Sequence, residues 1–134
     1  MAERLISRGE VYWVDLPDKG GSELKDKHLA VVISNNFQNR ASPVVIILPI
    51  TSRKKGDKLY HFEIETYFNK QTGKILVDQI TTVDKVRRFL GKRVAHVEEK
   101  MLVKIERKLC YVLGLSTEAL LEELAERLSR TKLF

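Results

Sequence analysis

The chain has 134 residues, of which 43% are hydrophobic and 31% are charged, a balance typical of one globular domain with a substantial core. No apolar run approaches the ~20 residues that a membrane span needs. Residues 1–8 contain no apolar signal region, so we expect a cytoplasmic protein. The single cysteine, Cys110, excludes an internal disulfide and a cysteine cluster for zinc.

The charge balance favours an anionic partner. Lysine and arginine number 24 against 18 acidic residues, which gives a formal net charge of +6 and a pI of about 9.5. Such an excess attracts nucleic acid, because bound cations release the counterions of the phosphate backbone. No run of five or more cations forms a tail, so the fold itself must assemble any basic surface.

The first half of the chain reads as strands separated by polar segments. Residues 9–16 contain valines and aromatic residues at both parities, and residues 29–34 form an apolar run, so both segments predict strands. Residues 17–28 predict a loop, because they open with proline and two glycines and continue with mixed charges. Residues 35–43 predict a polar connection.

The most apolar segment spans residues 44–52 and predicts a buried strand. Pro49 cannot donate to a ladder, so we expect an edge or a bulge there. The strand ends at Thr51 and Ser52, directly before the basic residues 53–55. Hydroxyls on a rigid strand beside cations suit a phosphate site, although two hydroxyls also suit a simple turn.

The second half predicts a loop, more strands and then helices. After the basic loop 53–58, residues 60–65 alternate, with Tyr60, Phe62 and Ile64 on the expected apolar side. We expect a turn at 69–73, a strand at 74–80 and a short strand at 92–97. Five to seven short strands followed by helices indicate an α+β or mainly-β fold, as a small barrel or a strongly bent sheet.

Two helices are predicted at the end of the chain. The first has apolar residues at helical spacing and a C-cap at Gly114. Ser116 or Thr117 is the expected N-cap of the second. The second helix has an apolar stripe and should pack on its own subunit or extend a dimer interface. We therefore expect a domain over residues 1–115 with a helical extension over 116–134. The stripe consists of Leu120, Leu121, Leu124, Ala125 and Leu128.

The order of four segments resembles the MazF/PemK family of toxins from type II toxin–antitoxin systems. The segments cover residues 8–16, 21–23, 31–52 and 76–85, so the resemblance spans roughly residues 8–115. It implies an SH3-like β-barrel with helices, usually a homodimer. It also implies a sequence-specific endoribonuclease that acts on single-stranded RNA without metal or cofactor, and an antitoxin whose acidic tail occupies the RNA groove.

The chemistry that the resemblance implies starts from the RNA itself. The 2′-hydroxyl attacks its own phosphate, which leaves a 2′,3′-cyclic phosphate and a 5′-hydroxyl. DNA lacks that hydroxyl and cannot react.

The resemblance also assigns catalytic residues. Thr51 matches the family's active threonine, and Glu23 matches an acid in the first loop. His28 stands where the family has a catalytic arginine. Histidine exchanges protons near neutral pH, so it is a general acid or base, whereas arginine is a permanent charge. Either His28 retains activity, with Lys25, Lys27 or Arg53 supplying the charge, or the site is inactive. A register slip of one residue would put Lys27 in its place.

Further residues are assigned to RNA binding. They are Lys25, Lys27, Ser52, Arg53, Lys54, Lys55 and Gln79. Gln79 reads a base edge or satisfies backbone groups near a bend. Trp13 stacks on a base or, as we favour, packs in the core. His61 is expected to face solvent.

Two other functions stay open. A related toxin family with the same barrel poisons topoisomerase (gyrase) by binding a protein and needs no catalytic centre. The second alternative is a non-catalytic RNA-binding regulator derived from the toxin fold. Cleavage of RNA separates the leading interpretation from both.

Overall fold

The computed structural model describes residues 5–68 and 70–132. Within these residues the chain forms seven strands and three helices, and the two longest helices come last. In chain order they are β1 (Glu10–Leu16), β2 (Asp26–Val32), α1 (Asn36–Ala41), β3 (Val44–Ser52), β4 (Glu63–Phe68), β5 (Gln71–Leu76), β6 (Thr81–Asp84), β7 (Phe89–His96), α2 (Glu99–Leu113) and α3 (Thr117–Lys132).

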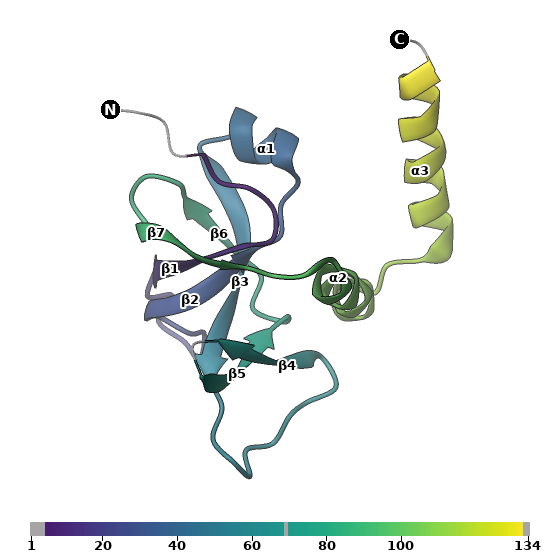
Figure 1. Cartoon of the computed structure of the whole chain (residues 1–134). Coiled ribbons are helices and arrows are strands. Elements are labelled where there is room, and N and C mark those ends of the chain that lie inside the picture. The colour runs from purple at the N-terminus through teal and green to yellow at the C-terminus, as the bar shows by residue number, and fades with distance from the viewer. Residues whose placement is uncertain (1–4, 69, 133–134) are drawn as a thin grey trace.

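The strands form one strongly bent antiparallel sheet (Figure 1). Its order is β4-β5-β3-β2-β1-β7, and β6 pairs with the first half of β3. The predicted fold of strands followed by helices is confirmed. The ladder does not close on itself within the described residues, because β4 and β7 remain the two ends of the path.

Strand β3 runs through the middle of the sheet, so the prediction that Pro49 marks an edge is wrong. One side of β3 pairs with β2. The other side pairs with β6 over Val44–Ile47 and with β5 over Ile50–Ser52. Pro49 falls in the gap between these two ladders, where its missing N–H interrupts no pairing on that side.

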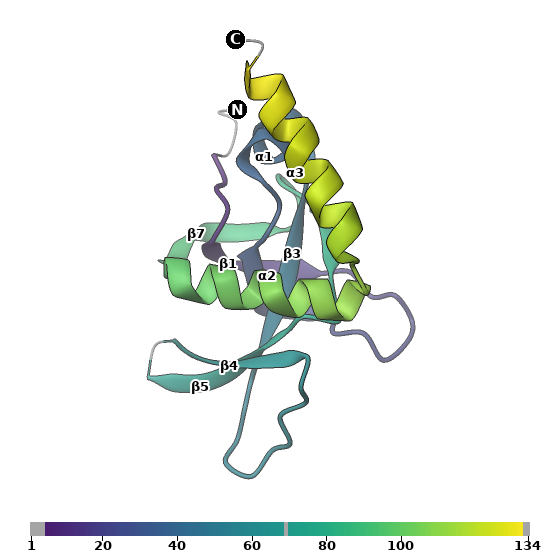
Figure 2. The ribbon, with the colours of Figure 1, turned by 90° about the vertical axis from the view of Figure 1, so that its right-hand side faces the viewer.

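The two faces of the sheet bury separate apolar clusters. Side chains alternate along a strand, so β1, β2 and β3 contribute to both. Helix α2 crosses the first face and inserts Leu102 and Ile105 (Figure 2). The first cluster contains Val11, Val31, Ile33, Leu48, Ile50, Ile64, Ile75, Val77, Val97, Leu102 and Ile105. The second contains Ile6, Tyr12, Val14, Leu16, Ala30, Val32, Val45, Ile47, Val83 and Phe89.

The predicted polar connection contains a short helix that the sequence reading missed. The side chain of Asn35 caps α1 by accepting from the Gln38 N–H. Asn39 is 1% exposed, bonds to the Ser34 hydroxyl and donates to the Ser34 carbonyl at 2.9 Å. The Lys85 ammonium donates to the Asn39 carbonyl at 2.7 Å. These polar residues therefore anchor α1 to the sheet, because buried polar groups need partners.

Two strand boundaries differ from prediction in a way that matters for the site. Strand β2 begins at Asp26, so His28 lies in a strand and not in the preceding loop. Strand β4 spans Glu63–Phe68 instead of residues 60–65, and Glu63 is buried on the side predicted to be exposed. Its carboxylate stays paired there, with the Lys74 ammonium at 3.1 Å.

Helix α3 stands clear of the sheet (Figure 1). Its residues 117–130 are all exposed, so the expected packing of this helix on its own subunit is wrong. Gly114 ends α2 with φ of 62°, and Ser116 Oγ accepts from the Ala119 N–H, as the capping signals predict. Among the described residues, no helix is both long and apolar enough to cross a membrane.

The β6–β7 turn provides a pH-dependent test of the fold. The backbone N–H groups of Arg87 and Val86 donate to the Asp84 carboxylate and hold its pKa below the ordinary value of 3.8. A group with a depressed folded pKa stabilises the fold above its ordinary value, and the effect is lost as pH falls through the folded pKa. We expect the Asp84→Ala variant to be less stable near neutral pH, with a difference that shrinks below pH 3.8.

Urea unfolding across pH measures this difference. Asp78→Ala is the control, because the exposed Asp78 carboxylate has no hydrogen bond within the described part of the chain. A difference that stayed constant into strong acid would show that the Asp84 charge does not stabilise the turn.

Candidate active site

A cavity of about 240 Å³ lies where the ends of β2, β3 and β5 meet. It brings together Thr51, Ser52, Lys27 and His28, which are residues predicted for the site. The complete lining is Trp13, Lys27, His28, Leu29, Ile50, Thr51, Ser52, Phe68, Gln71, Thr72 and Gly73.

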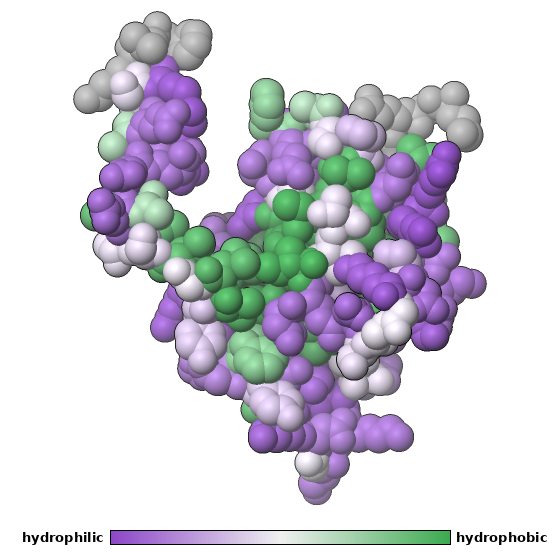
Figure 3. Space-filling view, turned by 180° about the vertical axis from the view of Figure 1, so that it is seen from behind, coloured by the Kyte–Doolittle hydropathy of each residue, from purple (hydrophilic) through white to green (hydrophobic). Residues whose placement is uncertain are grey.

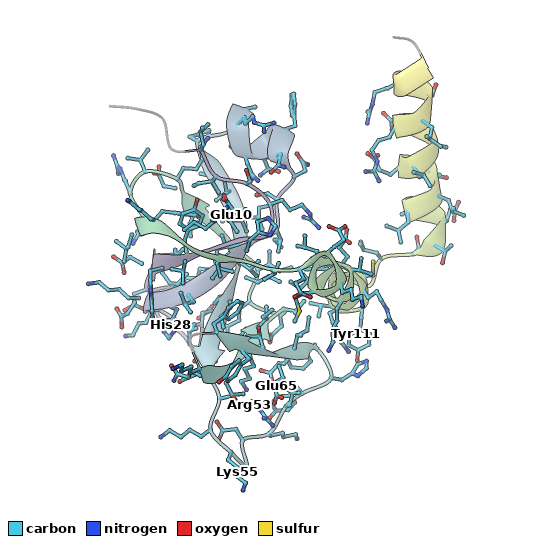
Figure 4. All side chains as sticks on the ribbon, viewed as in Figure 1. Glu10, His28, Arg53, Lys55, Glu65 and Tyr111 are labelled. Atoms are coloured by element: carbon cyan, nitrogen blue, oxygen red, sulfur yellow. The ribbon has the colours of Figure 1, made fainter. Side chains whose placement is uncertain are left out.

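Strand register places His28 beside Thr51. Leu29 of β2 and Ile50 of β3 form the last pair of this ladder, and His28 and Thr51 are the next residues outward, so a continued antiparallel register would oppose them. Directly opposed residues project to the same face of a sheet. Both side chains are half-buried at the end of their strands, as Figure 4 shows for His28. A proton-exchanging imidazole and a hydroxyl therefore occupy neighbouring positions.

A row of side chains continues from this pair across the sheet. Val14 lies opposite His28 on the β1 side. Lys74 lies opposite Thr51 on the β5 side, and Glu65 of β4 lies opposite Lys74. One face of the sheet thus carries a histidine, a hydroxyl, a cation and an acid on four adjacent strands.

The opposite face contributes a different chemistry to the same cavity. Lys27 and Ser52 continue the register beyond His28 and Thr51, so they project to the face of Trp13. Trp13 is 45% exposed and lines the cavity with Phe68, so our preference for core packing of Trp13 is wrong. Exposed aromatic rings beside a cation form a surface on which bases stack.

Two of the five predicted cations are already paired. The Lys25 ammonium lies 3.4 Å from the Asp18 carboxylate. The Arg53 guanidinium pairs with Glu65, and its second nitrogen donates to the Asp57 carbonyl at 2.8 Å (Figure 4). Neither Lys25 nor Arg53 lines the cavity.

Lys27 is the remaining cation of the predicted set near the cavity. It lines the cavity and has no ion pair within the described residues. Lys54 and Lys55 are exposed on the loop after β3, and Lys55 points away at its tip (Figure 4). The structure thus separates one cation in the cavity from two on a projecting loop.

Two other predicted residues lie outside the cavity lining. Glu23 is exposed in the first loop, with its carboxylate against Gly21. Gln79 accepts from the Leu24 N–H at 2.8 Å and so ties that loop to the strand end. This contact supports the backbone role of Gln79 over a base-reading role.

Three cavity residues were missed because residues 69–73 looked like a turn, and Phe68, directly before that turn, was also missed. Phe68, Gln71, Thr72 and Gly73 belong to the hairpin of β4 and β5 and close one side of the cavity. Gly73 was the feature of the sequence that could have indicated a close approach of β5 to β3. A Cβ at this position would lie 2.9 Å from the Thr51 carbonyl oxygen, so β5 can approach β3 this closely only with glycine there.

The chain matches a known protein family over most of its length. Residues 7–113 match the family described as PemK-like, MazF-like toxin of type II toxin–antitoxin system. The endoribonuclease EndoA of Bacillus subtilis is 35% identical over 114 residues, which are 83% of this chain and 97% of EndoA.

Solved structures show the same fold. MazF from Deinococcus radiodurans superposes with a TM-score of 0.69 at 24% identity, covering 84% of this chain and all of that one. A MazE–MazF structure from the same organism gives a TM-score of 0.65 at 25% identity, covering 85% of this chain and 100% of the other. In both comparisons part of this chain has no counterpart.

The close approach at Gly73 gives a test of the cavity geometry. We expect Gly73→Ala to push β5 away from Thr51 and to lower the free energy of unfolding by roughly 1–3 kcal/mol, as for other overpacked sites. Chemical unfolding measures this loss. Thr72→Ala is the matched control, because it adds no atom beside the Thr51 carbonyl. Equal stability of Gly73→Ala and the wild type would contradict the close approach.

Proposed function

Because this chain belongs to the PemK-like, MazF-like family of type II toxin–antitoxin toxins, we propose that it is an endoribonuclease that cleaves single-stranded RNA without a metal. The relative EndoA is named an endoribonuclease and is 35% identical over almost its full length. The observation that supports the proposal within this chain is that His28 and Thr51 line one cavity, each one residue beyond the last pair of the β2–β3 ladder.

The proposed step is transfer of the phosphate to the neighbouring 2′-oxygen. The 2′-oxygen bonds to phosphorus while the bond from phosphorus to the 5′-oxygen breaks. His28 takes the proton of the 2′-hydroxyl, and water supplies the proton that the leaving 5′-oxygen gains. The Thr51 hydroxyl donates to a non-bridging oxygen, where negative charge grows in the transition state.

Lys27 supplies the permanent charge in this proposal. An imidazole that acts as a general base carries no charge to balance the negative charge of the phosphate. Lys25 and Arg53 already pair with carboxylates. Lys27 is unpaired among the described residues and lines the same cavity. Trp13 and Phe68 then offer ring surfaces to a base next to the scissile phosphate. Glu23, Lys54 and Lys55 act at longer range on the loops around the cavity.

The family also supports a protein partner. The solved relatives include MazE–MazF structures. We propose that an antitoxin with an acidic segment binds this chain over the cavity, since the chain has a formal net charge of +6. A homodimer in the cytoplasm is the proposed state of the free toxin.

Cleavage with mapped ends is the first test. Purified protein is incubated with a long single-stranded RNA in excess chelator. We expect discrete cuts that leave 5′-hydroxyl and 2′,3′-cyclic phosphate ends. His28→Ala should lower the rate by ~10²–10⁴, the usual contribution of a general base. Thr51→Ala should lower it by roughly 10²-fold, as for other lost oxyanion donors.

His61→Ala is the matched control. His61 is exposed and contacts the Tyr111 ring, away from the cavity lining. RNA binding without cleavage would replace the enzyme with the RNA-binding regulator. If the protein neither bound nor cleaved RNA, a protein target such as topoisomerase would become the leading alternative. Cleavage that survives both substitutions would place the active site elsewhere.

The division of roles between His28 and Lys27 has its own test. Lys27→Ala should weaken RNA binding and lower the slope of log affinity against log salt by ~0.7, the value for one phosphate contact on a single strand. Lys25→Ala is the control, because Lys25 pairs with Asp18 outside the cavity. An unchanged slope in Lys27→Ala would remove Lys27 from the phosphate site.

A further inference from the structure

Helix α3 lies beyond the residues that match the family. The family match ends at residue 113, and α3 begins at Thr117. The helix carries an apolar stripe that no other element within residues 5–68 and 70–132 covers. Its leucines are 45%, 59%, 47% and 55% exposed at positions 120, 121, 124 and 128, respectively. A stripe of this kind on a monomer marks an interaction surface.

The charges on α3 are segregated along its length. The acidic residues Glu118, Glu122, Glu123 and Glu126 occupy the first part of the helix, and Arg127 and Arg130 follow. Ion pairs within the helix link Glu123 to Arg127 and Glu126 to Arg130. The helix is therefore acidic toward its start and basic toward its end.

We propose that α3 binds the α3 helix of a second copy of this chain in antiparallel orientation. Antiparallel pairing about Leu124 places Glu118 of each helix opposite Arg130 of the other. Parallel pairing would oppose the acidic parts instead. The leucine stripe is also self-complementary about Leu124. A twofold axis there brings Leu124 onto its own copy and Leu120 opposite Leu128.

The shape of the chain fits the same orientation. Helix α3 rises away from the sheet, so an antiparallel pair places the two sheets at opposite ends (Figure 1). A stable interface buries roughly 1,200–2,000 Å² in total, more than eight half-exposed leucines provide. Tyr111, Leu113 and Leu115 are 60%, 54% and 45% exposed and supply further area. Figure 3 shows apolar side chains gathered over α2 and reaching the base of α3.

Cysteine cross-linking of the full chain tests the orientation. In a Cys110→Ser background, Leu124→Cys should form a disulfide-linked dimer with itself on mild oxidation. Leu120→Cys should not, but it should link when mixed with Leu128→Cys chains. Glu122→Cys, on the polar face of α3, is the control and should stay unlinked. Self-linking of Leu120→Cys would overturn the antiparallel pair in favour of a parallel one.

The mass in solution tests whether pairing depends on α3. Leu124→Asp should halve the mass measured by light scattering, whether the wild type is a dimer or a tetramer. Glu122→Ala should not change it. An unchanged mass in Leu124→Asp would overturn the proposal, and so would a wild-type monomer at all concentrations. Because the readout is mass, it is independent of whether the chain cleaves RNA.

Discussion

The register between β2 and β3 is the constraint on which the candidate site depends. Leu29 pairs with Ile50 and both pack into the cluster beneath α2, where Ile50 is buried and Leu29 partly buried, and the next residues of both strands line the cavity. A shift of one residue would move a whole strand's apolar set to the other face. The core thus fixes His28 and Thr51 as the residues next to the last pair of the ladder, and the same core would resist a register with Lys27 in the place of His28.

Charge pairing then decides which cations remain for a ligand. The buried Glu63 carboxylate pairs with Lys74, and Glu65 pairs with Arg53, so the acidic residues of β4 neutralise these two cations near Thr51. These pairs connect β3, β4 and β5 across the side of the cavity that Gly73 allows to close. Among the described residues, Lys27 of β2 is therefore the lysine that lines the cavity, and the lysines of the projecting loop lie outside the lining.

Hydrophobic periodicity predicted the strands that contain long apolar runs. It failed where buried polar side chains stabilise the structure. β3 matched its predicted bounds, and Gly114 capped α2 as expected. The polar residues around Asn39 looked like a connection because hydrophobic periodicity does not reveal buried hydrogen bonds. Asn39 bonds to Ser34, and its carbonyl accepts from Lys85, which is far away in the sequence. Trp13 was misplaced because its exposure depends on where the β4–β5 hairpin ends, a tertiary feature.

The position of Trp13 has a practical consequence. It is the chain's single tryptophan, and it lies in the wall of the cavity shared with His28 and Thr51. Its indole emission therefore originates at the candidate site and nowhere else in the protein. A nucleobase that stacks there would quench this light, so occupancy of the site is readable in unlabelled protein, separately from any bond cleavage.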